Sequence, residues 1–522
     1  MHFVLSKLQP LSRPQPVCLA APDDTIIIPE LLMLIFDCLV PEDLASAALV
    51  CRAWSMASKK LWSTHEVPLS ALLAKTGFLA TKEADAPDEM RHYSISPGSL
   101  EPIVWMTLIH QYSHIITRLR IDSVIEESAL DILRQVLDLY GDSLFPRLYS
   151  VTFDMSAIAD VQWETIGVVA SMLKTLLNSS LMDVKFEGHE DDTRVMDICH
   201  SLPDLCPQIT DLTLGTPQNI DASYFRFRCH GFSNLKRLMI CDWKWEGWEG
   251  LGAPSGLEEI IITDSGVSDT EDFVLKPVTI LPSLRSLTIS LATLCRAALL
   301  EAEMPALRSL TIAELMETTG EVIEAISKRS PSLEHLDIRF ARARVTLRMT
   351  EALSALHGLR TLRLGGWASS VILIDSDITP LARSLIHLEN LSVIFDAAGS
   401  GRSPAPRIPK LTGSSFVAIL HHCNALKELE LQLDLSTFSL EEARSAAPVT
   451  PSETLTRLTL SRFTILPSEG LSRLAQDLAI CCPKVPQLKI RETPDGIMSS
   501  ERGMELVDEF YTYRQLSRPL SS

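Results

Sequence analysis

A run of two histidines and a cysteine, His421, His422 and Cys423, is one of two places where side chains of this sequence could do chemistry. A histidine next to a thiol can take its proton and create a nucleophile, so a thiol hydrolase using Cys423 beside His422 is one hypothesis. The run lies in a helical pattern just before an apolar strand pattern. Adjacent residues on a helix point about 100° apart, so they cannot easily bind one metal ion together. We therefore interpret them as buried structural residues.

The second place is Cys199 and His200 with Cys206, all of which are side chains that can bind zinc. This group lacks a second ligand pair at a spacing typical of zinc sites, so a structural interpretation is again favoured. The sequence contains neither a glycine-rich phosphate loop nor a serine-nucleophile elbow. We expect a protein that is not an enzyme and that has no metal site and no cofactor.

Composition narrows the possible partners. The 522 residues are 46% hydrophobic, which is enough for a large core and more than one domain. The formal net charge of -19, most of which lies after residue 68, argues against a surface that binds nucleic acid. No apolar stretch approaches the length that spans a membrane, and prolines interrupt the first 23 residues, so we expect neither a membrane segment nor a signal peptide.

The 11 cysteines are odd in number and scattered, and only Cys481 and Cys482 are adjacent. This usage is typical of reduced thiols, so we expect a cytoplasmic or nuclear protein.

A compact apolar pattern occupies residues 24–68. Leu31, Leu32, Ile35, Phe36 and Leu39 would form one broad stripe on a short helix. Two further short helices follow, and the third carries two tryptophans. Three helices in about 45 residues are close to the lower limit for an independent core, so some of these stripes must meet a partner. We interpret the segment as a docking module, although an ordinary helical bundle would show the same periodicity.

The ordered motifs of this segment resemble the F-box, the module that binds the adaptor in cullin-type (SCF) ubiquitin ligases. They are the run from Glu30 to Phe36, Asp43-Leu44, Val50-Cys51 with Trp54, and Leu61-Trp62. The sequence departs from the family pattern at the start, where Ile27-Ile28 precedes Pro29 in place of Leu-Pro. The resemblance implies binding to a Skp-type adaptor, and through it to a cullin scaffold. The residues that it implies for the adaptor interface and the core beneath it are Pro29, Leu31, Leu32, Ile35, Leu39, Leu44, Val50, Trp54 and Leu61.

A second pattern, Leu-x-x-Leu-x-Leu, recurs along the rest of the chain at a mean spacing of about 28 residues. Fourteen copies begin at residues 116, 148, 181, 209, 235, 257, 284, 307, 333, 359, 388, 426, 455 and 485. Helical segments follow several copies, such as EVIEAISKRS, EALSAL, SFVAILHHC and GLSRLAQDLAICC. Strands stack about 4.8 Å apart and helices about 8–10 Å apart, so a stack of such units must curve with its sheet inside.

These units resemble leucine-rich repeats of the longer, helix-bearing type, although the asparagine of that family after the strand is replaced, for instance by Ala292, Ala341 and Trp367. The fold class expected is α/β: a small N-terminal three-helix F-box followed by a curved leucine-rich-repeat solenoid with a parallel concave sheet and convex helices. The expected divisions are a flexible arm at 1–23, the F-box at 24–68, a connector at 69–115, the solenoid at 116–500, and a C-terminal helix and tail at 501–522.

Side chains alternate along each strand, so those flanking the second leucine of a repeat should face the concave side. As candidate contacts for a target protein we select His335, Asp337, Arg339, Arg363, Glu428 and Glu430. Three tryptophans follow one of the expected strands: Trp243, Trp245 and Trp248. We favour the interpretation that they pack in the core or between repeats over the alternative that they are interface anchors.

The resemblance implies a substrate-recognition subunit of an SCF-type ubiquitin ligase, in which the F-box binds the Skp adaptor and the repeats bind an unidentified target protein. The alternative is a leucine-rich-repeat interaction scaffold that acts without ubiquitination.

Overall fold

The computed structural model describes two compact units of the chain. The first comprises residues 1–129 and 143–148, and the second comprises 130–142 and 149–522. Residues with a described structure are 36, 65–70, 72, 79–81, 93–95, 113–121, 145–154, 176–177, 180–187, 201–215, 231–241, 256–263, 280–290, 302–315, 319–340, 347–367, 373–396, 411–434, 452–464, 468–491 and 500–516.

The smaller unit contains two short strand pairs. Strand β1 (Val67–Pro68) pairs in parallel with β4 (Arg118–Ile121), with Val67 opposite Leu119. Strand β2 (Leu79–Thr81) pairs antiparallel with β3 (Tyr93–Ile95). Parallel pairing thus begins upstream of the first repeat copy at residue 116.

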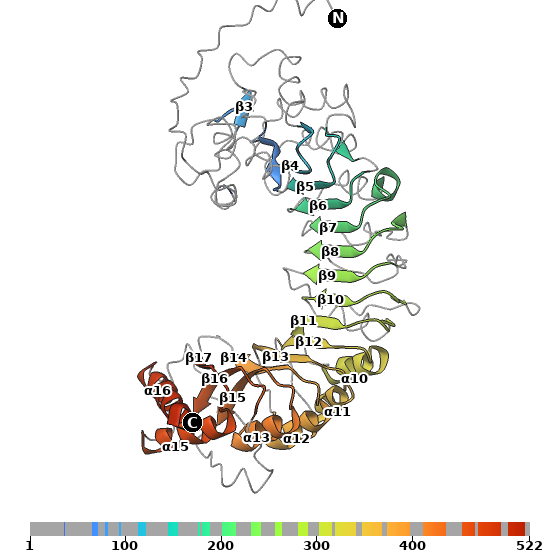
Figure 1. The fold of residues 1–522 in the computed structure, drawn as a ribbon. Helices are drawn as coiled ribbons and strands as arrows, with labels where there is room; N and C mark the ends of the chain where they lie inside the picture. Colours follow the sequence, from blue (N-terminus) through green and yellow to red (C-terminus); the bar gives the residue numbers. More distant parts are fainter. Residues whose placement is uncertain are drawn as a thin grey trace, which may run out of the picture. The chain divides into compact units, whose positions relative to one another are not determined.

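The larger unit contains a parallel sheet whose strands follow one another in chain order (Figure 1). Its strands are β5 (Ser150–Asp154), β6 (Asp183–Glu187), β7 (Asp211–Gly215), β8 (Arg237–Cys241), β9 (Glu259–Thr263), β10 (Ser286–Ile289), β11 (Ser309–Leu315), β12 (His335–Phe340), β13 (Thr361–Trp367), β14 (Asn390–Asp396), β15 (Glu428–Asp434), β16 (Arg457–Thr464) and β17 (Gln487–Arg491). Each strand begins two residues after the first residue of a copy of the Leu-x-x-Leu-x-Leu pattern. Every copy from residue 148 onward therefore forms a strand of this sheet.

The register keeps equivalent repeat positions side by side. Leu336 of β12, for example, is opposite Leu362 of β13, which is opposite Leu391 of β14. The three leucine positions of one repeat, Leu359, Leu362 and Leu364, are all at most 1% exposed. The repeated leucines therefore form one continuous hydrophobic core along the sheet.

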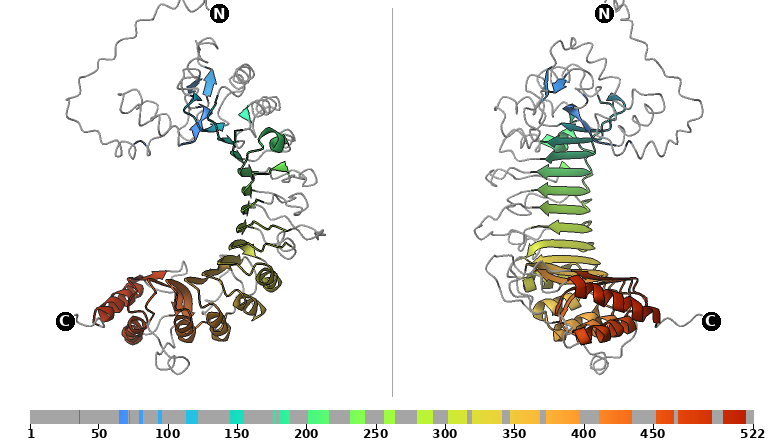
Figure 2. Two further views of the ribbon diagram at one scale, coloured as in Figure 1. Left: turned by 45° about the vertical axis from the view of Figure 1, so that its right-hand side comes forward. Right: turned by 90° about the vertical axis from the view of Figure 1, so that its left-hand side faces the viewer.

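Helices α10 (Thr319–Arg329), α11 (Leu347–Ser354), α12 (Asp375–Ser384), α13 (Gly413–His422) and α15 (Ser468–Cys481) cover the leucine side of the sheet. In α10 the buried residues Val322, Ile323 and Ile326 form the stripe that packs on the sheet. Within this unit the sheet bends, with strands inside and helices outside (Figure 2). This arrangement confirms the expected α/β solenoid with a concave parallel sheet.

The last repeat is closed by α16 (Ser500–Leu516), which packs beside α15. Leu506 and Phe510 of α16 are fully buried. The Tyr511 hydroxyl accepts a hydrogen bond of 3.1 Å from the Leu488 amide and donates one of 3.0 Å to the Pro486 carbonyl. Helix α16 thus covers the apolar end that a further repeat would otherwise cover.

None of the helices in the described ranges combines the length and the apolar character that crossing a membrane requires.

Candidate protein-binding surface

The side of the larger unit's sheet that faces away from the helices carries the third, fifth and seventh positions of each repeat, counted from the first leucine. In β12 these are His335, Asp337 and Arg339, which alternate with the buried Leu336 and Ile338. The alternation follows from the pleat, which points successive side chains to opposite faces. We call this side of the sheet, from β5 to β17, the concave face.

All six predicted target-contact residues lie on the concave face. His335, Asp337 and Arg339 share β12, and Arg363 lies on the neighbouring strand β13, directly opposite Asp337. Glu428 and Glu430 lie on β15, with β14 between them and Arg363. The structure thus brings four of the residues together and places the two glutamates at the side of this group.

Local contacts hold several of these side chains. The Nδ1 atom of His335 lies 3.0 Å from the Thr361 hydroxyl. On β15, Glu430 accepts a hydrogen bond of 3.0 Å from the Ser392 hydroxyl. Glu428 forms an ion pair of 2.9 Å with Arg457 of β16. These three residues are therefore partly committed to contacts within the sheet.

The two arginines among the predicted target contacts differ from His335, Glu428 and Glu430 in having no such contact in the described ranges. Arg339 and Arg363 are exposed, and among the described residues neither side chain has an ion pair or a hydrogen bond. Asp337 is half-buried and equally without such a partner in the described part of the chain. Position seven of the next strand is Gly365, so Arg339 has no side chain beside it on β13.

Two strands of the concave face, β5 and β16, carry a buried side chain at the fifth repeat position. Thr152 on β5 is 1% exposed and Thr459 on β16 is 9% exposed. Residues at the same repeat position on β6 to β15 are half-buried or exposed. A continuous accessible surface therefore extends from β6 to β15.

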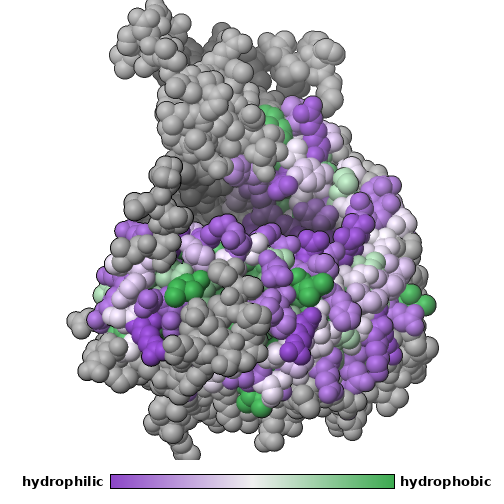
Figure 3. All heavy atoms as spheres, turned by 60° about the horizontal axis from the view of Figure 1, so that its bottom comes forward, coloured by the Kyte–Doolittle hydropathy of each residue, from purple (hydrophilic) through white to green (hydrophobic). Residues whose placement is uncertain are grey.

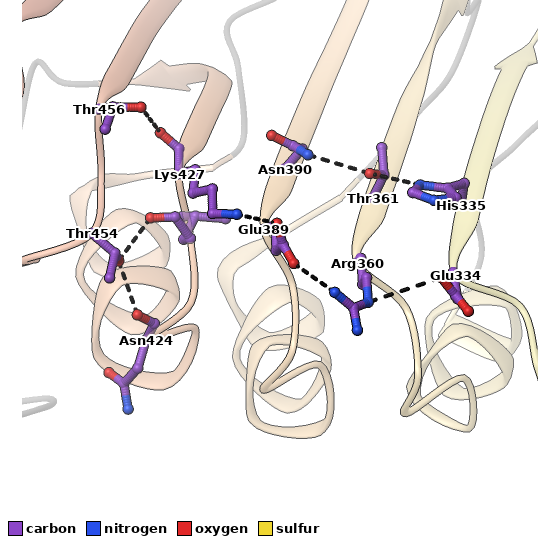
Figure 4. A network of polar contacts seen from close by, with 11 residues as sticks. Glu334, His335, Arg360, Thr361, Glu389, Asn390, Asn424, Lys427, Thr454 and Thr456 are labelled. Carbon is purple, nitrogen blue, oxygen red and sulfur yellow. Dashed lines mark hydrogen bonds and ion pairs between the residues drawn. The ribbon is translucent and has the colours of Figure 1, made fainter.

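A ladder of alternating charges runs along the second position of consecutive repeats (Figure 4). Arg308 lies 3.3 Å from Glu334, and Arg360 lies 3.9 Å from Glu334 and 3.0 Å from Glu389. Lys427 also bonds Glu389, and this hydrogen bond is the main reason why the pKa of Glu389 is lowered. The ladder links repeats from β11 to β15 just before their strands begin.

Strand alternation does not predict this ladder, because the second repeat position lies just before the strand and does not flank the second leucine. Its signal was present as the alternating signs of Arg308, Glu334, Arg360, Glu389 and Lys427, each immediately after a repeat's first leucine. Exposed ion pairs stabilise a fold only slightly, so we expect the ladder to contribute little to the stability of the solenoid.

A polar cluster joins two helices on the outer side of the sheet. The carboxylate of Asp375, the first residue of α12, accepts hydrogen bonds from the hydroxyls of Thr412, Ser414 and Ser415 and from the Thr412 amide. Burial alone would raise the pKa of Asp375, but these hydrogen bonds outweigh it and the pKa is lowered. Thr412 is also the N-cap of α13, so Asp375 orients the residue that begins the next helix.

The proposed thiol nucleophile, Cys423, is buried. It is 1% exposed, and its Sγ lies 3.6 Å from the Ala382 carbonyl oxygen. Burial raises the pKa of the Cys423 thiol to about 12, so almost none of it is thiolate at neutral pH. Burial, with the positive charges of His421 and Arg383, lowers the pKa of His422. The environment thus opposes the activation that a thiol hydrolase needs.

Of the possible zinc ligands, only Cys206 lies in a described range, and burial raises the pKa of its thiol to about 12. Across the described residues, no group of three or more histidine, cysteine or acidic side chains is placed to hold a metal ion. Cys199, His200 and the three tryptophans Trp243, Trp245 and Trp248 lie outside the described residues.

The predicted adaptor-binding residues also lie outside the described residues. They are Pro29, Leu31, Leu32, Ile35, Leu39, Leu44, Val50, Trp54 and Leu61. Between them, Phe36 is described, and it is helical and 1% exposed.

Comparison with known proteins identifies the N-terminal segment. A family model described as F-box-like matches residues 29–66, so the chain contains an F-box-like domain there. The comparison with curated proteins gave no match.

Two solved structures are similar over most of the chain. A chain of the yeast Rad7 and Elc1 complex shares 15% identity at a TM-score of 0.36, covering 76% of this chain and 90% of that one. A chain of the Drosophila Toll–Spatzle complex shares 12% identity at a TM-score of 0.33, covering 74% of this chain and 49% of that one. At these scores the likeness is too distant to support an inference about function.

Proposed function

We propose that this protein is the substrate-recognition subunit of an SCF-type ubiquitin ligase. The observation that carries the proposal is the pairing of an F-box-like match at residues 29–66 with a repeat solenoid whose concave face is accessible over many strands. The F-box binds a Skp-type adaptor, which connects the protein to a cullin scaffold. The concave face binds the target protein.

The protein acts by proximity in this proposal and performs no bond chemistry itself. It holds a target near a ubiquitin-charged enzyme, which raises the effective concentration of the acceptor lysine. The raised pKa of the buried Cys423 thiol argues against Cys423 as a nucleophile, because a nucleophilic cysteine requires a lowered pKa.

The proposal assigns separate tasks to the segments of the chain. Residues 24–68 form the adaptor-binding F-box, 69–115 form a connector, and 116–500 form the target-binding solenoid, with an arm before them and a helix and tail after them. The described cysteines, which include Cys206, Cys241 and Cys423, are all free thiols. Free thiols support a cytoplasmic or nuclear location.

Co-purification tests the proposal. The full chain, expressed in eukaryotic cells, is expected to bring down a Skp-type adaptor and a cullin. Recovery of adaptor without any cullin would favour the alternative, an interaction scaffold that acts without ubiquitination. Recovery of neither protein would contradict the proposed function.

A further inference from the structure

The concave face changes character along the chain. At the fifth repeat position, five consecutive strands from β7 to β11 carry uncharged, half-buried side chains: Thr213, Met239, Ile261, Thr288 and Thr311. The register places each of them directly beside the next. The seventh position of the same strands is uncharged as well, with Gly215, Cys241, Thr263 and Ala313 among its residues. We call this row of five fifth-position residues the neutral band.

Charged residues border the neutral band on both sides. On one side, Asp337 of β12 lies beside Thr311 of the neutral band. The exposed Arg339 lies further along β12, and the exposed Arg363 lies opposite Asp337 on β13. On the opposite side, the register places Lys185 of β6 beside Thr213, and Lys185 forms an ion pair of 3.7 Å with Asp183, whose neighbour on β7 is Asp211. The β6 border is net negative because two carboxylates outnumber the single Lys185, whereas the β12–β13 border is net positive because two arginines outnumber Asp337.

The arginine border differs from the charge ladder in its pairing. The basic residues of the charge ladder, Arg308, Arg360 and Lys427, are all in ion pairs. The side chains of Arg339 and Arg363, by contrast, have no ion pair or hydrogen bond within the described part of the chain. In a protein of net charge -19, leaving two neighbouring guanidinium groups unpaired keeps them available for an anionic partner.

The surrounding carboxylates do not satisfy these arginines. Glu428 is paired with Arg457, and Glu430 accepts a hydrogen bond from Ser392, which lies between it and Arg363 in the register. Asp337 lies beside Arg363 without an ion pair. The glycine at position 365 leaves Arg339 without a neighbouring side chain on β13.

We propose that the concave face recognises an extended acidic segment of a target protein, with the carboxylates of the segment on Arg339 and Arg363 and its uncharged residues on the neutral band. This proposal rests on the proposed function and specifies its target class. Six strand spacings of about 4.8 Å separate β7 from β13, which is about 29 Å, or about nine extended residues. At the β6 border Asp183 and Asp211 outnumber Lys185, so the net negative charge there disfavours the acidic end and favours one direction of the segment across the sheet.

The test is a selection of random twelve-residue peptides displayed on phage against the immobilised full chain. Such peptides are long enough to reach from β7 to β13. The wild-type chain is expected to enrich peptides with two or more Asp or Glu residues at one end and uncharged residues in the remainder. Selection of peptides without an acidic end would overturn the proposal.

The charge-reversed variant Arg339→Glu with Arg363→Glu is expected to enrich peptides with Lys or Arg at that end. The matched control is Lys489→Glu, which reverses an exposed basic residue on β17 of the same face. The Lys489 side chain has no partner among the residues that the structure describes, and the variant should select the same peptides as the wild type. The inference fails if the double variant selects the same acidic peptides as the wild type.

Binding of the best acidic peptide, labelled with fluorescein, gives a second readout by fluorescence anisotropy. Arg363→Ala should weaken binding about threefold and the double reversal about tenfold, with smaller differences at high salt. Asp337→Asn should tighten binding, because it removes the carboxylate that competes for the arginines. Weaker binding to Asp337→Asn would contradict the assignment, provided that circular dichroism shows an unchanged fold.

The selection needs no adaptor, so the two proposals fail separately. If the chain binds acidic peptides but no Skp-type adaptor, the ligase function is wrong and the surface assignment stands. If the adaptor binds but peptide selection shows no acidic preference, the surface assignment is wrong and the ligase function stands.

Discussion

Asp375 at the start of α12 accepts a hydrogen bond of 2.8 Å from the amide of Thr412, the residue that caps α13. Replacing Asp375 with alanine removes the acceptor for this amide and for three hydroxyls. We expect the free energy of unfolding to fall by about 1–2 kcal/mol, measured by urea denaturation at pH 7. The control is Asp377→Ala in the same helical turn, which loses a bond to one amide, that of Ile374, and should cost less.

The lowered pKa of Asp375 predicts that its contribution to the free energy of unfolding depends on pH. The pKa of Asp375 is lower in the folded protein than its ordinary value of about 3.9, so its stabilisation is complete above that value and is lost as the pH falls through the folded pKa. The stability difference between the wild type and Asp375→Ala should therefore narrow below about pH 4. A difference that stays constant into the acid range would show that the charged form is not the one stabilised.

Gly366 on β13 has a φ of 115°, a conformation that residues with side chains rarely adopt. A Cβ atom at this position would lie 2.5 Å from the Phe340 amide nitrogen of the adjacent strand β12. Gly366→Ala is expected to lower the free energy of unfolding by at least about 2 kcal/mol. Gly358→Ala is the matched control, since its Cβ would lie 3.7 Å from the Leu333 carbonyl oxygen, an ordinary contact. Equal stability of the two variants in urea denaturation would refute this explanation.

Thiol labelling distinguishes a structural Cys423 from a reactive one. Burial and a pKa of about 12 should make Cys423 unreactive towards iodoacetamide in the native protein at pH 7.5. The half-buried Cys241 should be modified first, and unfolding in urea should make both equally reactive. Mass spectrometry of the labelled peptides measures the two rates. Rapid native labelling of Cys423 would revive the thiol-hydrolase hypothesis.

The sheet could be predicted from the sequence because each strand repeats the same local rule. The apolar residues at the first, fourth and sixth positions are buried in every repeat from residue 148 to residue 455, so the pattern beginning at residue 333 predicts the strand at His335–Phe340 without knowledge of its neighbours. Helix α12 shows a weaker helical pattern than the segments named from the sequence, because it contains Pro380. Pro380 is the sixth of its ten residues, and it lacks the amide that would donate a hydrogen bond within the helix.

Strand alternation predicts that His335 and Arg363 lie on the concave face. It does not predict which side chains they contact there. Whether Arg363 meets Asp337, Ser392 or no partner depends on register and on side-chain conformations across strands that are far apart in the sequence. The same limit applies to Asp375 and Thr412, whose hydrogen bonds join two helices through a long connection. Local patterns predict elements, and contacts between repeats require the three-dimensional structure.

The most direct test of the central claim is capture of a Skp-type adaptor by the full chain and by the variant Leu32→Glu with Ile35→Glu. The wild type should bind the adaptor in a stable complex, and the double variant should lose it while its circular dichroism and the urea midpoint of the solenoid stay unchanged. Lys489→Glu, on the concave face of β17, should bind the adaptor as the wild type does. Failure of the wild type to bind, or equal binding by the double variant, would contradict the account.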